Sequence, residues 1–150
     1  MRYRRQALLR AGVKNTLQGF GEHLPFPDNN FDFITMGYAL RHVTDLNLLF
    51  SEYHRVLKPG GKILLLEITQ PQHPFRRAMV KLYLKRVIPT ITLVFLGSAK
   101  AQRLMQYYWE TIENCVPPKT ILSPMELTGL STVNRYVEQG IFSEYTGIKE

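Results

Sequence analysis

The chain has 150 residues, of which 45% are hydrophobic and 11% aromatic. This composition argues against wholesale disorder and supplies enough apolar material for a core, and the length predicts one domain over residues 1–150. The single cysteine, Cys115, excludes an intramolecular disulfide framework, a cysteine-rich zinc site and a CxxC redox pair. Because the four histidines lack metal-ligand spacing, no metal is expected.

Positive charge is concentrated in two stretches that contain no acidic residue. The sequence holds 19 Lys and Arg residues against 12 Asp and Glu residues, for a net charge of +7. Five bases lie within residues 1–14, and seven lie between Glu67 and Glu110. A basic balance permits nucleic acid, anionic lipid or an acidic substrate as a partner. Because no nucleic-acid recognition motif is present, nucleic acid is not an expected partner.

The second basic stretch is a candidate for contact with a membrane surface. The longest apolar run, Val87–Gly97, is about half the ~20 residues that a membrane-spanning helix needs. Arg77, Lys81 and Lys85 share one helical stripe, and an apolar stripe lies beside it. This pattern fits peripheral membrane contact through residues 75–103, the alternative being ordinary solvated helix faces. Since the N-terminus has no signal-peptide core, a cytoplasmic location with such membrane association is expected.

Signals for helices and strands alternate along the first part of the chain. They predict, in order, a helix over 4–11, a weak strand over 14–20, a loop over 25–30 and a strand over 31–36. Thr44 or Asp45 can cap the next helix, whose apolar positions follow helical spacing to Leu57. Lys58-Pro59-Gly60-Gly61 predicts a turn that ends this helix. The apolar run Ile63–Leu66 is typical of a strand buried on both faces in a parallel sheet.

The second part of the chain is predicted to hold three helices and a hairpin. Two helices are expected over 75–86 and 99–114. Ser123 is the expected N-cap of a third, with Pro124 in its first position. Two strands are expected over 133–138 and 141–145, with a tight turn at Gln139-Gly140. Strands that alternate with helices and end in an antiparallel hairpin indicate an α/β fold with a mixed sheet.

No motif for a common chemistry is present. The sequence has no GxGxxG, no GxxxxGK[ST] and no GxSxG, so phosphate cradles and a nucleophile elbow find no support. Ligands of open α/β sheets bind beyond the carboxyl ends of strands, which here are expected at 20–22, 36–38 and 67–69. Composition and spacing therefore locate three segments that can border a binding site, but they do not identify a function.

Three peptides resemble a known family. Residues 21–32, GEHLPFPDNNFD, look like the AE-x-LPFPDNSFD segment of class I S-adenosylmethionine-dependent methyltransferases. Residues 41–45, RHVTD, are similar to the RNVTD of the ubiquinone/menaquinone biosynthesis C-methyltransferase family, and residues 55–61 match its RVLKPGG. The resemblance implies a partial Rossmann-like class I methyltransferase sheet. It also implies S-adenosyl-L-methionine as cofactor and methyl transfer to a small aromatic or prenylated, hence lipophilic, quinone precursor.

The same resemblance assigns the cofactor-binding residues. Phe20 and Gly21 are expected by the adenine, and Met36 and Gly37 by the methionine end of the cofactor. Phe20 stands where family members carry Asp or Asn, so this residue can stack on the adenine but cannot accept a hydrogen bond from its amino group. His42 replaces the usual Asn of the family.

Catalytic and substrate roles are assigned as hypotheses. His42, Tyr38 and Arg41 are the candidate catalytic residues, and His42 is preferred as proton acceptor because its unperturbed pKa of about 6.5 suits the task. A hydrogen bond to the backbone is the structural alternative for His42. Tyr107, Tyr108 and Glu67 are candidate substrate residues. The alternatives are core packing for the two tyrosines and pairing with a basic neighbour for Glu67.

The resemblance also predicts an absence. The family's first strand, its glycine-rich loop and its ribose-binding acid should precede Lys14, and only thirteen residues do. The chain is therefore expected to correspond to the rear part of one methyltransferase domain, with 31–36 as an exposed apolar edge strand that pairs in a homodimer or with a missing-half partner. Two alternatives are an inactive remnant or interaction module that pairs through that edge, and a basic lipid- or RNA-surface binder.

Overall fold

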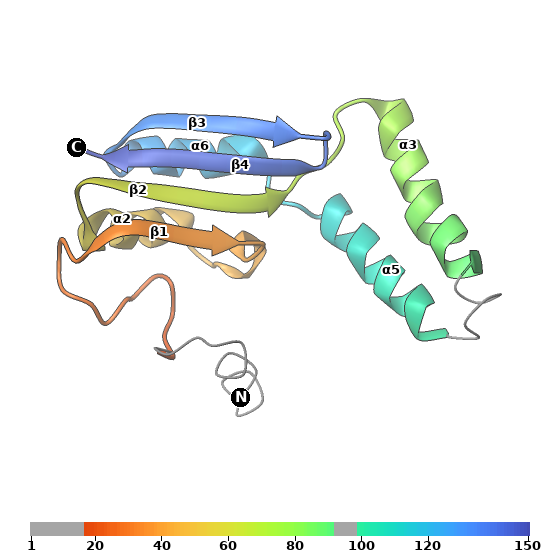
Figure 1. The fold of residues 1–150 in the computed structure, drawn as a ribbon, viewed down its shortest axis with the longest axis horizontal. Coiled ribbons are helices and arrows are strands. Elements are labelled where there is room, and N and C mark those ends of the chain that lie inside the picture. Colours follow the sequence, from red (N-terminus) through yellow and green to blue (C-terminus); the bar gives the residue numbers. More distant parts are fainter. Residues whose placement is uncertain (1–16, 92–98) are drawn as a thin grey trace.

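The computed structural model describes residues 17–91 and 99–150. The helix expected over 4–11 and most of the apolar run 87–97 lie outside the described residues. The elements, in chain order, are β1 (Phe31–Gly37), η1 (Leu40–His42), α2 (Leu46–Val56), β2 (Leu57–Ile68), α3 (Pro74–Leu82), η2 (Tyr83–Val87), α5 (Ala99–Glu113), α6 (Pro118–Leu127), β3 (Leu130–Glu138) and β4 (Phe142–Lys149). Figure 1 shows one layer of strands backed by α2 and α6, with α3 and α5 standing beside it.

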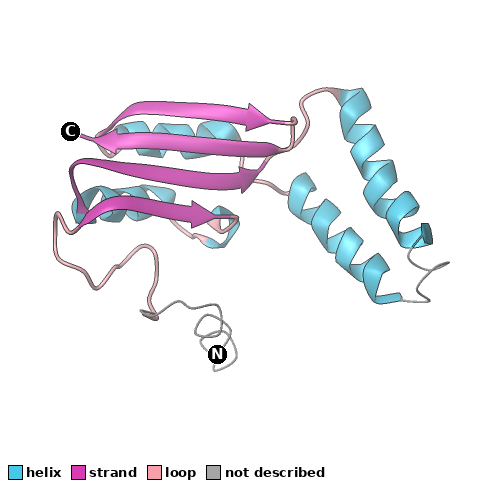
Figure 2. Ribbon diagram, in the orientation of Figure 1, coloured by secondary structure: helices cyan, strands magenta, loops and turns pink. Residues whose placement is uncertain are grey.

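The sheet is mixed, as predicted, with the strand order β1-β2-β4-β3. β1 and β2 are parallel, and Met36 pairs with Leu65 in their register. β4 pairs antiparallel with both β2 and β3. The predicted α/β fold is therefore confirmed (Figure 2), and within the four described strands β1 is the apolar edge that the sequence predicted.

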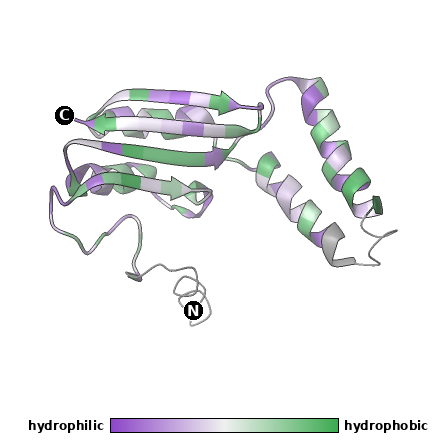
Figure 3. Cartoon of the chain, in the orientation of Figure 1, coloured by the Kyte–Doolittle hydropathy of each residue, from purple (hydrophilic) through white to green (hydrophobic). Residues whose placement is uncertain are grey.

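The core lies between the sheet and two helices on one of its faces. Leu49 and Phe50 of α2 and Met125 of α6 are buried against Ile63 and Leu65 of β2. Side chains of a strand point alternately to the two faces, and on the other face Leu66 is 38% exposed. The prediction that this strand is buried on both faces was wrong, because the described helices that back the sheet lie on one face. Figure 3 shows β2 as a largely hydrophobic strand.

Helix α2 begins at the predicted cap. Asp45 accepts hydrogen bonds through Oδ1 from the backbone nitrogens of Asn47 (2.9 Å) and Leu48 (3.1 Å), which satisfies two of the free N–H groups of the first turn. The predicted turn after this helix lies inside β2. Phe31 pairs with Leu57 and Phe33 pairs with Lys62, so residues 58–61 form an irregularity within the strand pair.

Two further predictions are corrected. Residues 17–19 form no strand, and Phe20 makes a single bridge to His23, because β1 pairs with β2 and leaves this segment no strand partner in the described sheet. Helix α6 begins at Pro118, so the predicted capping residue Ser123 lies inside the helix. Proline fits a first helical position because its missing N–H has no acceptor there, and both Pro118 and Pro124 meet this condition.

The terminal hairpin is confirmed. Gln139 and Gly140 connect its strands with φ values of 52° and 76°, and the antiparallel partners Glu138 and Phe142 flank the connection. Positive φ at consecutive positions suits the twist of a tight hairpin, and glycine adopts it without steric cost.

The predicted helices over 75–86 and 99–114 are also confirmed. Arg77 and Lys81 of α3 turn toward α5: Arg77 Nη2 lies 3.9 Å from a Glu113 carboxylate oxygen, and Lys81 Nζ lies 5.5 Å from the centre of the buried Trp109 ring. Two members of the basic stripe therefore contact α5, while the third, Lys85, is exposed. The apolar stripe is exposed as well, with Phe75 66% accessible.

Candidate active site

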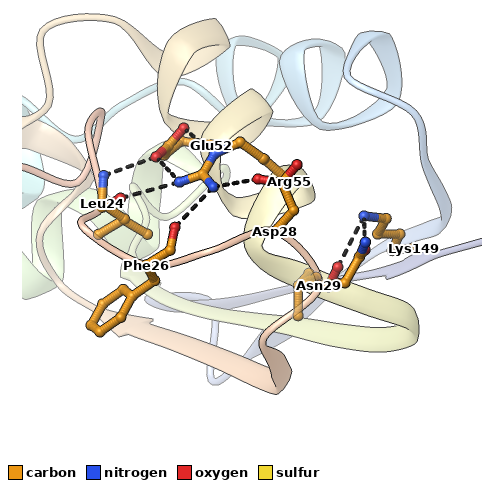
Figure 4. A network of polar contacts seen from close by, with 8 residues as sticks. Leu24, Phe26, Asp28, Asn29, Glu52, Arg55 and Lys149 are labelled. Carbon is orange, nitrogen blue, oxygen red and sulfur yellow. Dashed lines mark hydrogen bonds and ion pairs between the residues drawn. The ribbon is translucent and has the colours of Figure 1, made fainter.

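Arg55 is the first residue of the family peptide 55–61, and it connects α2 to the loop of the family peptide 21–32 (Figure 4). Its guanidinium donates to the carbonyl oxygens of Leu24 (3.1 Å) and Phe26 (2.9 Å) and to Asp28 Oδ1 (2.6 Å). It also holds both carboxylate oxygens of Glu52, at 2.5 and 3.0 Å, while Glu52 Oε1 accepts from the Leu24 N–H at 2.9 Å. These contacts raise the pKa of Arg55 and lower the pKa of Glu52. The network positions the chain that leads from residue 20 into β1.

The segment after β1 begins with a strained residue. Tyr38 has a φ of 55°, a left-handed conformation that is uncommon for a bulky side chain, and its N–H donates to the Leu66 carbonyl at 2.8 Å. Its side chain is 45% exposed and lines a small hollow of about 40 Å³ with Glu67, Tyr136 and Phe142. Strain of this kind is concentrated at functional sites. The sequence carried no signal for this conformation.

Glu67 supports the turn that carries two of the candidate catalytic residues. Its side chain is buried, and its carboxylate accepts hydrogen bonds from the N–H of Leu40 (3.1 Å) and of Ile68 (3.2 Å). Leu40 is the first residue of η1, so the carboxyl end of β2 holds η1 in place. Glu67 therefore fixes the backbone at Leu40, directly before Arg41 and His42.

Arg41, His42 and Tyr107 come together although 66 residues separate the first from the last. Arg41 Nη2 donates to the Tyr107 hydroxyl at 2.6 Å, and the guanidinium carbon lies 5.4 Å from the centre of the same ring. Arg41 Nε donates to His42 Nε2 at 3.2 Å. Tyr108 packs edge-on against Tyr107 with 6.2 Å between ring centres. Both tyrosines are about half exposed, so the cluster is open to a ligand.

The bond from Arg41 bears on the role of His42. A nitrogen that accepts a hydrogen bond carries a lone pair, so a neutral His42 bears its proton on Nδ1 in this arrangement. Nε2 becomes free to accept another proton only when Arg41 turns away from it. Arg41 thus lies between His42 Nε2 and the Tyr107 hydroxyl. A histidine nitrogen can accept the proton of a substrate hydroxyl that lies beside it.

The residues expected at the cofactor lie at two places near η1. Phe20 is 76% exposed, and Glu22 Oε1 accepts from the Thr44 N–H at 3.1 Å, which holds this segment beside the start of α2. A Cβ at Gly21 would lie 2.7 Å from Leu49 Cδ1, so any larger residue there would force this fully buried leucine of α2 to shift. At Gly37, by contrast, a Cβ would meet nothing within 4 Å.

The exposed ring and the open space fit two parts of a nucleoside cofactor. Phe20 can stack on a planar base, since its ring is largely accessible, and the space at Gly37 lies at the carboxyl end of β1, where ligands of α/β sheets bind. The side chain of Met36, which was also expected at the methionine end, is partly buried against the core. A cavity of about 510 Å³ adjoins this region and is lined by η1, the first turn of α2 and part of α6, including Arg41 and Asn47.

The described residues contain neither a metal-binding cluster nor a membrane-spanning helix. Across residues 17–91 and 99–150, no group of three or more His, Cys, Asp or Glu side chains is arranged to hold a metal ion. Among the helices of those same ranges, none combines the length and the apolar character that crossing a membrane requires.

Comparisons with known proteins agree with the resemblance seen in the motifs. Residues 2–149 match the model of the ubiE/COQ5 methyltransferase family. The ubiquinone/menaquinone biosynthesis C-methyltransferase of Shewanella halifaxensis is 37% identical over 139 residues, which cover 92% of this chain and 54% of that protein. The enzyme of the same name from Saccharophagus degradans is 34% identical over 149 residues, covering 97% and 59%. The chain thus spans somewhat more than half the length of these relatives.

Solved structures are similar in fold. A SAM-dependent methyltransferase from Aquifex aeolicus matches with a TM-score of 0.62 and 17% identity, over 99% of this chain and 63% of that one. A SAM-dependent methyltransferase from Thermotoga maritima matches with a TM-score of 0.62 and 19% identity, over 98% and 70%. At these identities the likeness supports the fold alone.

Proposed function

Because this chain belongs to the ubiE/COQ5 methyltransferase family, we propose that it serves methyl transfer from S-adenosyl-L-methionine to a ring carbon of a small aromatic or prenylated quinone precursor. The observation that carries the proposal is the family match over residues 2–149, together with relatives named as C-methyltransferases. A cluster of Arg, His and Tyr at the carboxyl ends of two parallel strands supports it. The proposal treats residues 1–150 as part of one methyltransferase domain.

When bound, S-adenosyl-L-methionine supplies an electrophilic methyl group. In this proposal Phe20 stacks on the adenine, and the space beside Gly37 receives the methionine end. Tyr38 follows directly and turns the chain away from β1 in its strained conformation. Holding the two reactants in line is the main task of such a site, and good alignment alone can lower a barrier by several kcal/mol.

The acceptor is activated by the cluster on η1 and α5. In this proposal its hydroxyl takes the position of the Tyr107 hydroxyl at the Arg41 guanidinium, which stabilises the developing phenolate. Arg41 then releases His42 Nε2, which takes the proton. After the ring carbon has gained the methyl group and lost its own hydrogen as a proton to solvent, His42 returns a proton to the oxygen. Tyr107 and Tyr108 offer aromatic faces to the ring of the acceptor, and Glu67 keeps η1 in register through the Leu40 N–H. General-base action of this kind contributes roughly 10²–10⁴ to a rate.

Cofactor binding is tested by calorimetry with S-adenosyl-L-methionine on the full chain. A Kd tighter than about 1 mM is expected, which corresponds to roughly −4 kcal/mol. Gly37→Val fills the open space and should weaken binding at least tenfold, whereas Thr35→Val, on the same exposed strand, should leave it unchanged. Absence of heat at millimolar cofactor would instead support a non-catalytic module that pairs through β1, which dimerisation measured by light scattering would then reveal.

A lipophilic acceptor suggests a membrane as its source, and the exposed stripe of α3 supports this partner. Phe75, Met79 and Leu82 are 66%, 55% and 55% exposed on one side of the helix. Arg76 and Arg86 are exposed on the same helical segment and can contact anionic head groups. We expect this surface to rest on an anionic bilayer while the opposite side of α3 packs on α5.

Vesicle co-sedimentation tests this contact. Binding to anionic vesicles should decrease as salt screens the charges, and Met79→Asp should abolish it. Leu127→Asp is the matched control, because Leu127 is 80% exposed on α6 and away from the stripe. Equal losses in both variants, or equal binding to neutral vesicles, would refute the proposed surface.

A further inference from the structure

A second cavity, of about 540 Å³, lies where the β3–β4 connection meets the start of α3. Its polar lining consists mainly of hydrogen-bond donors that bear or can bear positive charge: Arg76, Arg135 and His73, with the side chains of Gln70 and Gln72 beside them. No Asp or Glu is among the residues that line it. The methyl-transfer proposal does not use this cavity, and the membrane surface proposed above shares only Phe75 and Arg76 with it.

Arg135 is held in a fixed position by neutral groups. Its Nε and Nη2 donate to Ser143 Oγ at 3.1 and 3.0 Å, and Nη2 donates to Thr69 Oγ1 at 3.0 Å. Its guanidinium carbon lies 5.8 Å from the centre of the Tyr145 ring. Both hydroxyl partners are buried, at 1% exposure for Ser143 and 4% for Thr69. The guanidinium is therefore oriented in advance, and its charge meets no carboxylate in these contacts.

Carboxylates near Arg135 are engaged elsewhere. Glu67 lies on β2, which β4 separates from β3, and its carboxylate accepts from the backbone N–H groups of Leu40 and Ile68. Within residues 17–91 and 99–150, no ion pair is recorded for Arg135 or for Arg76. The Tyr145 phenol also shares a hydrogen bond with the Arg135 side chain, so Ser143, Thr69 and Tyr145 are all neutral partners of this guanidinium.

Arg76 brings a second guanidinium to the same cavity from α3. Its Nη1 lies 3.7 Å from the position that a Cβ on Gly140 would occupy, so it reaches the β3–β4 connection. Two like charges at one cavity repel each other, and an anion between them removes that repulsion. A guanidinium also matches the geometry of carboxylate and phosphate oxygens, with two parallel N–H donors.

The cavity is large for an inorganic ion and partly apolar. Phe75 is 66% exposed and Val137 38% exposed on its wall, so an apolar body can cover them. From these observations we propose that the cavity binds a small organic oxyanion, a carboxylate or a phosphate monoester. Its charged group lies between Arg76 and Arg135, and its apolar body lies against Phe75 and Val137. The inference does not depend on the proposed methyl transfer.

The test is a titration of the full chain followed by amide NMR shifts, with Gly140 and Gln70 as reporters at the cavity. Benzoate and phenyl phosphate should bind with a Kd of about 1 mM or tighter, and benzyl alcohol, which lacks the charge, should cause no shift. Arg76→Gln and Arg135→Gln should each weaken benzoate binding roughly tenfold, because each removes charge-assisted hydrogen bonds. Arg135→Lys keeps a charge, so it reports on the site should Arg135→Gln unfold the chain.

Arg103→Gln is the matched control, since it removes the same charge from an exposed position on α5. It should change binding less than twofold. The inference is overturned by an absence of benzoate binding at ten times the expected Kd, or by equal weakening in Arg76→Gln and Arg103→Gln. Binding of inorganic phosphate as tight as that of phenyl phosphate also overturns it, because the apolar wall then plays no part. The readout needs no cofactor or turnover, so failure of methyl transfer leaves it intact.

Discussion

Replacing Glu52 by Gln tests whether the network that Glu52 and Arg55 of α2 form with the loop over 24–28 stabilises the fold. Glu52 Oε1 accepts from the Leu24 N–H, and both carboxylate oxygens accept from Arg55, while only 15% of the side chain is exposed. Glutamine keeps the shape but removes the charge and turns an NH₂ group toward the guanidinium. Hydrogen bonds to charged groups contribute about 1.5–3 kcal/mol each, so after allowance for solvent around Arg55 we expect a loss of about 2 kcal/mol at pH 7.

The loss should depend on pH in a definite direction. Arg55 holds the pKa of Glu52 below its ordinary value, so the carboxylate stabilises the fold above the unfolded pKa of about 4.3. This contribution disappears as the pH falls through the lower, folded pKa. The difference in unfolding free energy between Glu52→Gln and the parent should therefore shrink as the pH falls from 7 toward and below that folded pKa.

Urea denaturation at neutral and acidic pH, followed by circular dichroism, measures this difference. In thermal denaturation at pH 7, the melting temperature of Glu52→Gln should lie roughly 4–8 °C below that of the parent for a domain of this size. Asp32→Asn is the control, because Asp32 also pairs with a base, Lys58, but its side chain is 83% exposed. The reasoning fails if Glu52→Gln costs the same at both pH values, or if it costs no more than Asp32→Asn.

Three further outcomes are expected. Gly61→Ala should destabilise the fold by about 2 kcal/mol in urea denaturation, because its Cβ would lie 2.7 Å from the Lys58 carbonyl oxygen, and Gly37→Ala, in open space, should change the same quantity far less. Burial raises the pKa of Tyr53 to about 12, so its phenol should ionise near that value in ultraviolet titration, and the stability it contributes should be complete below pH 10 and lost between 10 and 12. Burial likewise raises the pKa of Cys115, so iodoacetamide should alkylate it more slowly at pH 8 in the folded chain than in urea, and equal rates would contradict the structure.

The helix cap and the hairpin turn were predictable because their signals are local. Asp45 satisfies N–H groups two and three residues away, and Gln139-Gly140 closes its own turn. The start of α6 was missed because two prolines that can each occupy the first position of a helix, Pro118 and Pro124, lie six residues apart, and local signals do not rank them. Strand 14–20 was predicted from residue type, whereas a strand requires a neighbour to take its hydrogen bonds.

The residues of the candidate site were named from motifs, but their arrangement was not. Which side of α3 contacts α5 depends on the position of Trp109. Helical periodicity therefore located the basic and apolar stripes of α3 without showing which of them contacts α5. The conformation of Tyr38 and the meeting of Arg41 with Tyr107 left no mark in the neighbouring residues. The hydroxyl partners of Arg135 left no such mark either, because Ser143 lies on β4 and Thr69 directly follows β2.

The sequence by itself determined the family, the α/β class and most element boundaries, because periodicity, capping and turn chemistry act over a few residues. Only the tertiary structure decided which sheet face the helices cover, which guanidinium meets which carboxylate and where two arginines share a cavity. Such contacts join residues tens of positions apart. They form only where the packing of the whole core brings distant side chains within a few ångströms of one another.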